Sequence, residues 1–481
     1  MPVPLLSDTR LQAAHVRRFG RGDALVLGLS GSGPAQTLAV SLAGLVAACR
    51  YGGALPLLVC LVPMLGIALG YQRLNRWAPN AGATYAWVAS VFHPLLGFLA
   101  GWMILLYYTL GTSSLTIPAG NYTLELVAPH LVDQPLAVAL TGGAWNVLVT
   151  LLAILGLRLA ARFELAIVIF QYGVLGGAAV AGIAALWHGT AAVPFSWGWF
   201  SLNAMGGMRG FTGGMLIACF MYSGWDAAIY VNEESTDRHH HPGQAALASV
   251  LILALCYVVC VLGFQAALPA DDLAAHAGNA LALIGPALLG KPWGTLMSLA
   301  VLTGTLATLQ AAVISAARVS RAMARDGVMP ALLNRTASLT GNPWAATAVM
   351  GTLNLLLLGV ALTTGNVGRA MNNVVSSLGL IAIGFYVLTG AAAVWQDRKR
   401  LHLSVRDLIF GGVLPCGGSL FLAWVAVESV RSGATSAEVL AWGAGSIALG
   451  GVVALLLARR PGITFFRSGP LAPAVSQGVD S

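Results

Sequence analysis

Charged residues are scarce in this chain: Asp, Glu, Lys and Arg make up 9% of its 481 residues, whereas 57% are hydrophobic. Soluble domains carry about 25% charged residues, so this composition excludes an ordinary soluble protein. The hydrophobic residues gather in continuous runs, which excludes a transmembrane β-barrel, because barrel strands alternate apolar and polar residues. The composition therefore indicates a protein whose α-helices cross a bilayer.

A spanning helix needs about 20 apolar residues, and twelve runs are close to that length or exceed it. The polar segments between them are too short to bury a core of their own. We therefore predict an all-α polytopic membrane protein with twelve transmembrane helices in a single domain, 1–481. The predicted spans lie near 24–48, 53–71, 84–112, 136–157, 164–187, 209–232, 244–268, 294–318, 345–363, 371–395, 406–429 and 437–458.

Motifs of enzyme and metal chemistry are also missing. The six cysteines are scattered without a CxxC pair, which indicates neither a disulfide framework nor a zinc site. The chain has no phosphate-binding loop, ATPase signature or nucleophile–base pair. We therefore predict a protein that is not an enzyme and that uses neither a metal nor another cofactor.

Basic residues are distributed unevenly between the loops. When the loops alternate from a cytosolic N-terminus, only five of the 25 Lys and Arg residues fall on the outer side. This bias matches the positive-inside rule and predicts cytosolic tails at 1–22 and 459–481. The net charge of +8 is thus a topology signal and requires no nucleic-acid partner. The five outer residues are Arg50, Arg209, Lys291, Arg369 and Arg431.

Glycines interrupt the first and the sixth predicted span. The first contains Gly31-Ser32-Gly33-Pro34, and the sixth contains Ser223-Gly224-Trp225-Asp226. Such interruptions free backbone groups that must find partners in protein or in a water-filled cavity. Broken helices at corresponding places in two halves of a chain indicate the binding site of a secondary transporter. Glycines that only permit close helix packing are the alternative.

Asp226 places a carboxylate in the middle of the sixth span. A charge at membrane depth costs about 2.5–3.5 kcal/mol on insertion scales, so such a residue normally faces a polar cavity or a partner. Asp226 is therefore a functional-site candidate. The alternative is an acid that only packs against a neighbouring helix.

Four motifs, in order along the chain, resemble the amino acid–polyamine–organocation family of transporters. They are the break at 31–33, the loop RWAPNAGATY at 76–85 with GFLAGW at 97–102, the break at 223–226 with Glu233-Glu234 after it, and RVSRAMARDGVMP at 318–330. The resemblance implies a five-plus-five inverted repeat (LeuT-like) over 23–395 with broken helices one and six. It also implies two extra helices over 406–458, alternating access and a substrate pocket at mid-membrane.

The two breaks suit the two ends of an amino acid. A half-helix N-terminus attracts a carboxylate, for which we expect Ser32 and Gly33 to be donors, and free carbonyls near Phe220 can accept from an ammonium. The resemblance also implies that Phe220 closes over the substrate. The predicted substrate-binding residues are Ser30, Gly31, Ser32, Gly33, Phe220, Tyr222, Ser223, Gly224, Trp225 and Asp226.

Two residues are candidates for coupling transport to an ion. Asp226 could carry a proton or could pair with a cationic substrate, and related exchangers place an acid at the matching position. Gln171 stands where some relatives place a lysine, and it cannot carry charge or titrate. Sodium is a further option, because Thr303, Thr305 and Thr308 could supply oxygen ligands.

We therefore predict secondary active transport of an amino acid or related amine by alternating access, either proton-coupled or by exchange. The alternatives are a polyamine permease and a transporter-like amino-acid sensor without net flux. The expected partners are the small-molecule substrate, a proton or else sodium, and the lipid bilayer, with the chain a monomer or a homodimer. The expected location is the plasma membrane, a bacterial inner membrane, which the chain crosses many times.

Overall fold

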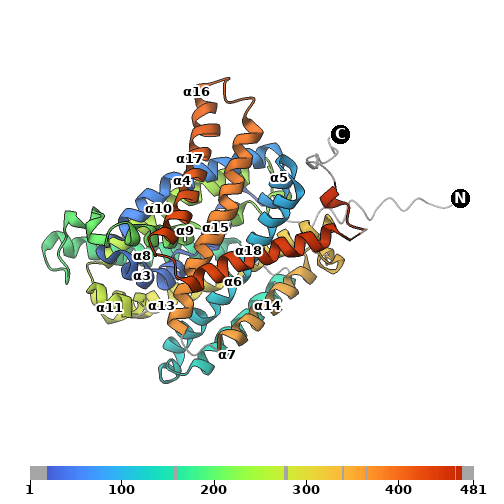
Figure 1. Cartoon of the computed structure of the whole chain (residues 1–481). Coiled ribbons are helices and arrows are strands. Elements are labelled where there is room, and N and C mark those ends of the chain that lie inside the picture. Colours follow the sequence, from blue (N-terminus) through green and yellow to red (C-terminus); the bar gives the residue numbers. More distant parts are fainter. Residues whose placement is uncertain are drawn as a thin grey trace.

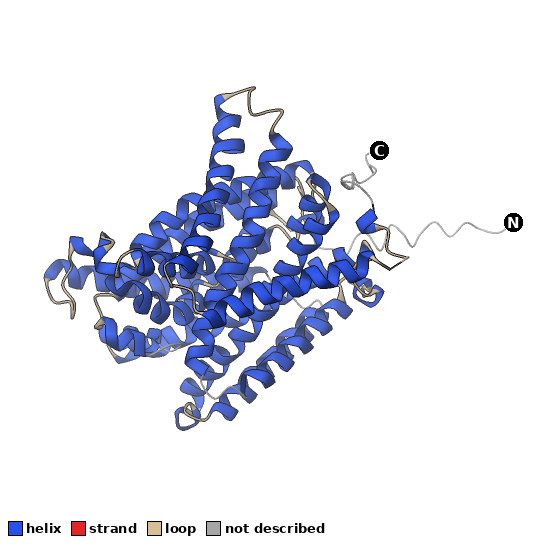
Figure 2. Cartoon of the chain, in the orientation of Figure 1, coloured by secondary structure: helices blue, strands red, loops and turns tan. Residues whose placement is uncertain are grey.

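The computed structural model describes residues 19–155, 161–275, 280–337, 341–362, 367–460 and 462–467, and their regular structure is helical (Figures 1 and 2). The only β-structure in these ranges is an isolated bridge between Phe19 and Ser235. The helices in chain order are α2 (Arg21–Ser32), α3 (Pro34–Cys49), α4 (Ala54–Trp77), α5 (Thr84–Val91), α6 (Pro94–Val127), α7 (Pro135–Leu155), α8 (Ala161–His188), α9 (Met208–Tyr222), α10 (His241–Phe264), α11 (Ala270–Ala275), α12 (Ala280–Leu289), α13 (Lys291–Arg325), α14 (Trp344–Leu362), α15 (Val367–Asp397), α16 (Val405–Asp407), α17 (Leu414–Arg431) and α18 (Ala437–Ala458).

Within the described residues, every predicted span overlaps one or more helices. Within the described ranges, eleven helical segments are long and apolar enough to cross a membrane. The ninth predicted span, 345–363, corresponds to α14, whose apolar part Trp344–Val360 is slightly shorter than the others. The first span consists of α2 and α3 together, and the sixth consists of α9 and the short 3-10 helices η5 (Trp225–Ala228) and η6 (Asn232–Glu234).

The third predicted span, 84–112, has the wrong start. The structure divides this run into α5 and the much longer α6, which begins at Pro94. His93 is extended, and its side chain accepts a hydrogen bond from the Leu95 N–H at 3.1 Å. A residue before proline is disfavoured in the helical region, while proline suits the first position of a new helix. The sequence His-Pro thus ends one helix and begins the next.

The sixth span lies at the centre of the bundle. Its most apolar stretch is completely buried, whereas only 22% of the corresponding stretch of α18 is buried. In Figure 1, α18 runs along the near side of the bundle, and α9 lies deeper within it. α9 packs against α3, α4 and α15. The apolar core thus surrounds the interrupted helix, and the functional candidates on it are shielded from lipid.

Ion pairs join the helix ends on one side of the bundle, which we call the arginine-rich end and define by Arg73, Arg318 and Arg325. Arg318 donates to the Glu234 carboxylate at 2.6 Å, and Arg325 lies 3.2 Å from Glu233. Arg73 in α4 pairs with the two acids Asp397 and Asp407 at 2.6 and 3.0 Å. These contacts connect the end of the sixth span to α13, and α4 to the segments around α15 and α16.

The start of the first span lies at the same end. The Phe19 N–H donates to the Glu234 carbonyl at 3.0 Å, and the Thr236 N–H donates to the Phe19 carbonyl at 2.9 Å. α2 therefore begins at the arginine-rich end, and α3 leads away from it.

Candidate functional site

The break in the first span is a single residue wide. α2 ends at Ser32, and α3 begins at Pro34. Gly33 between them has φ 43° and ψ 75°, a left-handed conformation that L side chains rarely adopt. Its N–H donates to the Leu29 carbonyl at 3.0 Å, so this predicted donor already has a partner. In the first turn of α3, the N–H groups that have no carbonyl acceptor within the helix are instead those of Ala35 and Gln36.

The break in the sixth span is wider. α9 ends at Tyr222, Ser223 is extended, and Gly224 has φ 98° before η5 begins. The Ser223 N–H donates to the Phe220 carbonyl at 2.9 Å, and its hydroxyl donates to the Cys219 carbonyl at 2.6 Å. The Phe220 carbonyl thus has one partner. The carbonyls of Tyr222 and Ser223 are the acceptors for which no helical N–H is positioned.

The two breaks touch each other through their backbones. A methyl group added at Gly31 would lie 2.5 Å from the Gly224 carbonyl oxygen, and one added at Gly224 would lie 2.5 Å from the Gly31 carbonyl oxygen. Real Cβ atoms essentially never approach so closely. Both positions therefore require glycine, and the two interruptions form one continuous site.

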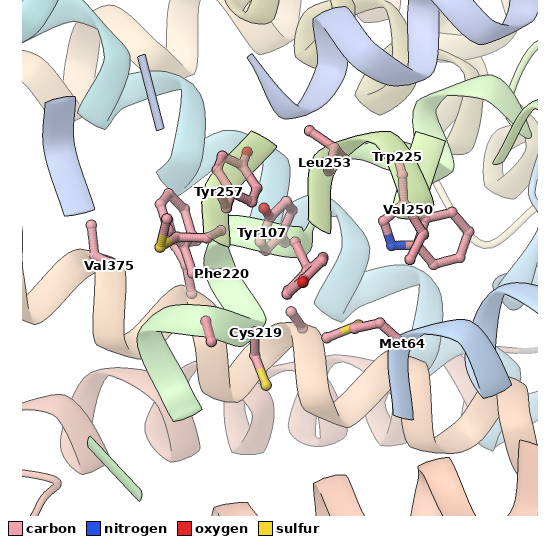
Figure 3. Packing of buried hydrophobic residues seen from close by; sticks show 14 of the residues in the cluster. Met64, Tyr107, Cys219, Phe220, Trp225, Val250, Leu253, Tyr257 and Val375 are labelled. Carbon is pink, nitrogen blue, oxygen red and sulfur yellow. The ribbon is translucent and has the colours of Figure 1, made fainter. Parts of the chain in front are cut away.

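A pocket lies beside this contact, between the two breaks, α6 and α13. Four of the predicted residues line it, namely Gly31, Ser32, Phe220 and Ser223. Figure 3 shows Phe220 and Tyr107 near each other in the packed region around the sixth-span break. The pocket residues that the sequence analysis did not predict include Gln36, Thr37, Tyr107 and Tyr108.

The other predicted substrate-binding residues lie outside the pocket lining. The Tyr222 hydroxyl donates to the Leu57 carbonyl at 3.1 Å, so its side chain points toward α4. Trp225 is completely buried and stacks on Tyr386, with ring centroids 5.7 Å apart. Ser30, Gly33 and Gly224 contribute to the backbone of the breaks without lining the pocket.

Asp226 is buried and is not one of the residues that line the pocket, with 1% of its surface exposed. Its Oδ2 accepts a hydrogen bond from the Tyr230 hydroxyl at 2.8 Å, and its Oδ1 has no partner among the described residues. Tyr107 and Tyr108 line the pocket, and the ring of Tyr108 packs edge-on against Tyr230, with ring centroids 5.8 Å apart. Asp226 itself is absent from the pocket lining, and no described cation pairs with it.

Gln171 belongs to α8, and its side chain faces α13. Its side chain is buried, and its Oε1 lacks a hydrogen-bond partner in the described part of the chain. A methyl group added at Gly304 would lie 2.6 Å from that oxygen. A neutral amide thus contacts the α13 backbone one turn before Thr308, which lines the pocket.

Hydroxyl groups satisfy the carbonyls that the first break leaves free. Thr308 donates to the Ser30 carbonyl at 2.9 Å and lies equally close to the Gly304 carbonyl. Thr37 donates to the Ser32 carbonyl at 2.5 Å. The other two threonines considered for sodium, Thr303 and Thr305, bond to carbonyls of their own helix at 2.8 and 2.7 Å. The hydroxyls of α13 therefore stabilise helix backbones in this structure.

We expect Thr308→Val to weaken the first break. Valine keeps the shape of threonine, but it leaves the buried Ser30 carbonyl without its donor, which costs about 1–3 kcal/mol. Thermal unfolding of the purified protein should therefore begin at a lower temperature. Thr303→Val is the matched control, because Thr303 bonds only to its own helix. Equal unfolding temperatures for the two variants would show that the Thr308–Ser30 bond does not stabilise the break.

Comparisons with known proteins agree with this architecture. The family model described as "Amino acid permease" matches residues 24–453. The low-affinity putrescine importer PlaP of Escherichia coli K12 is 25% identical over 388 residues, which cover 76% of this chain and 79% of that protein. The human large neutral amino acids transporter small subunit 2 is also 25% identical, over 76% of this chain and 66% of its own length.

Two solved structures have the same fold. MhsT in complex with L-phenylalanine superposes with a TM-score of 0.59 at 16% identity, over 84% of this chain and 98% of that one. A mutant of the Eremococcus coleocola manganese transporter gives 0.57 at 14% identity, over 95% and 94%. The predicted all-α, LeuT-like fold is therefore confirmed. Because the family model covers most of the chain, this protein belongs to the amino acid permease family and is a transporter, not an enzyme.

Proposed function

We propose that this permease carries an amino acid or a related amine by alternating access, with the pocket between the two breaks as its binding site. The supporting observation is the direct contact between the two breaks at Gly31 and Gly224, together with a pocket that Gln36 of one break and Ser223 of the other both line. The first-turn N–H groups of α3 suit a carboxylate. The unpaired carbonyls after Phe220 suit an ammonium.

The arrangement of polar contacts supports a state that is closed toward the cytosol. Ion pairs and the Phe19 bridge close the arginine-rich end. The pocket lies at the middle of the spans, lined from Tyr107 to Ser114 in α6 and from Thr308 to Ala312 in α13. With the N-terminus in the cytosol, as the positive-inside bias favours, this closed end faces the cytosolic side of a bacterial inner membrane.

Asp226 is our candidate for the coupling residue. Its absence from the pocket lining argues against direct pairing with the substrate. A carboxylate that is buried without a cation favours its neutral, proton-bearing form. We therefore favour a proton as the coupling ion, with loading and release linked to the movement of the sixth span.

Uptake by reconstituted protein tests this proposal. Purified protein in liposomes should accumulate at least one member of a panel of labelled amino acids and putrescine, and an inward proton gradient should raise its accumulation. Empty liposomes and a gradient collapsed by a protonophore are the controls. If no member of the panel is accumulated or exchanged, while several raise the thermal stability of the protein, the chain is instead a sensor without net flux.

A further inference from the structure

We infer that the substrate is an amino acid with an uncharged side chain, and that the Gln36 carboxamide is a specificity-determining group that donates to its carboxylate. This inference rests on the proposed function, because it concerns the same pocket. It goes further by choosing between the two substrate classes of the relatives, neutral amino acids and a diamine.

The first observation is the absence of ionisable acids and bases from the pocket wall. No described residue that lines it is Asp, Glu, Lys, Arg or His. Apart from Gln36, Phe220 and two tyrosines, the lining consists of glycine, alanine, leucine, serine and threonine. A charged group taken from water into such a site has no counter-charge, and burying an unpaired charge is strongly unfavourable.

The backbone can compensate one charge of each sign and no more. The N-terminus of α3 offers positive potential, and the carbonyls of the sixth-span break offer negative potential. In a zwitterionic amino acid, the carboxylate would bind at the N-terminus of α3 and the ammonium at the carbonyls of the sixth-span break. A second ammonium, as in lysine or putrescine, or a second carboxylate, as in glutamate, would therefore remain uncompensated.

Asp226 does not provide that missing counter-charge. It is absent from the pocket lining. Its Oδ2 is also engaged by the Tyr230 hydroxyl. The acid in the sixth span therefore does not make this pocket a site for a cationic side chain.

The second observation is an unpartnered buried amide. Gln36 lines the pocket and is 1% exposed. Its Oε1 lies 3.3 Å from the Thr37 hydroxyl, while its Nε2 has no hydrogen-bond partner among the described residues. Buried polar groups are normally satisfied, so an orphaned donor in a pocket wall points to a ligand with an acceptor.

The position of Gln36 explains which acceptor it contacts. It is the third residue of α3, and helical side chains lean back toward the helix N-terminus. The amide therefore lies over the same N-terminus whose backbone N–H groups suit a carboxylate. One side chain and the first turn of α3 together provide a set of donors for a single anionic group.

Ligand-dependent unfolding of the purified full-length chain tests both parts of the inference. A ligand that binds the folded state raises the unfolding temperature in proportion to its affinity and concentration. L-Leucine, L-serine, L-lysine, L-glutamate and putrescine are compared at equal concentrations, and titrations give relative affinities. We expect stabilisation by at least one of the two neutral amino acids and by none of the three other compounds.

Two substitutions at Gln36 distinguish a role as a hydrogen-bond donor from a role that depends only on side-chain size. Gln36→Met keeps the length and removes the donor, and should weaken binding of the neutral amino acid about tenfold, the effect of one hydrogen bond to a charged group. Gln36→Glu should weaken it further, since a carboxylate would face a carboxylate. Gln310→Met is the matched control: Gln310 is also buried with an unpartnered Nε2, yet it lies outside this pocket.

The possible outcomes are distinct. Stronger stabilisation by lysine or putrescine than by neutral amino acids would overturn the inference and leave the proposed transport function intact. Unchanged affinity in Gln36→Glu would show that the amide does not face the carboxylate, and would overturn its role as a donor. Absence of any stabilisation, together with absence of uptake, would instead reject the proposed function itself.

Discussion

Replacing Asp226 by asparagine should abolish the effect of a proton gradient on uptake while substrate binding persists. Asparagine has nearly the same shape as aspartate and can still accept the hydrogen bond from Tyr230, but it cannot bind and release a proton. A gradient of one pH unit supplies about 1.4 kcal/mol per proton, enough for about a tenfold concentration ratio. Wild-type liposomes should approach that ratio, and the variant should only equilibrate or exchange its substrate.

The measurement is uptake into proteoliposomes at matched and unmatched pH, with binding followed by thermal unfolding. Glu125→Gln provides the control, because it also converts an acid to its amide, within α6 and away from the pocket lining. The Asp226→Asn protein should bind substrate within a few-fold of wild type. Gradient-driven accumulation that survives in this variant would remove Asp226 from the coupling mechanism.

Alanine at Gly224 should reduce transport severely. Its φ of 98° is unfavourable for any residue with a Cβ, and conformations of this kind cost about 1–3 kcal/mol. The added methyl group would also lie 2.5 Å from the Gly31 carbonyl oxygen, so the two breaks would have to separate. We expect uptake to fall below about a tenth of the wild-type rate, which corresponds to a change of only about 1.4 kcal/mol.

Gly176→Ala in α8 is the control for a glycine-to-alanine change in a spanning helix, since nothing lies within 4 Å of the added methyl group. It should retain wild-type uptake. Gly31→Ala approaches the same contact from the other side, with its methyl 2.5 Å from the Gly224 carbonyl oxygen, and should share the defect. Normal uptake by the Gly224→Ala protein would mean that the breaks do not need to touch during transport.

The sequence predicted the helices well because the bilayer imposes a length and a composition on each span. The start of the third span was missed for a local reason. Residues 84–93 are as apolar as a span, but the backbone restriction imposed by Pro94 outweighs their hydropathy. The pairing of the two breaks was also predictable, because glycines next to polar residues are conspicuous within apolar runs.

The pocket wall was less predictable. Tyr107 and Tyr108 lie on α6, which is regular at that point, and no local pattern shows which side of a fully apolar helix faces a cavity. The direction of Trp225 also could not be inferred, because it follows the break, where the periodicity of α9 no longer applies. Gln36 did leave a signal, since it is an amide inside an apolar run one turn after the first break.

The second half of the sixth span should change its conformation at a lower free-energy cost than the first half. After Gly224 it continues as the 3-10 helices η5 and η6, whose hydrogen-bond geometry is poorer than that of an α-helix. Such a segment can change its winding more easily than α9 can. Asp226 lies at its start and Glu234, the partner of Arg318, at its end. Protonation of Asp226 in the middle of the bundle and opening of the Arg318–Glu234 ion pair at its edge therefore act on the same easily deformed segment.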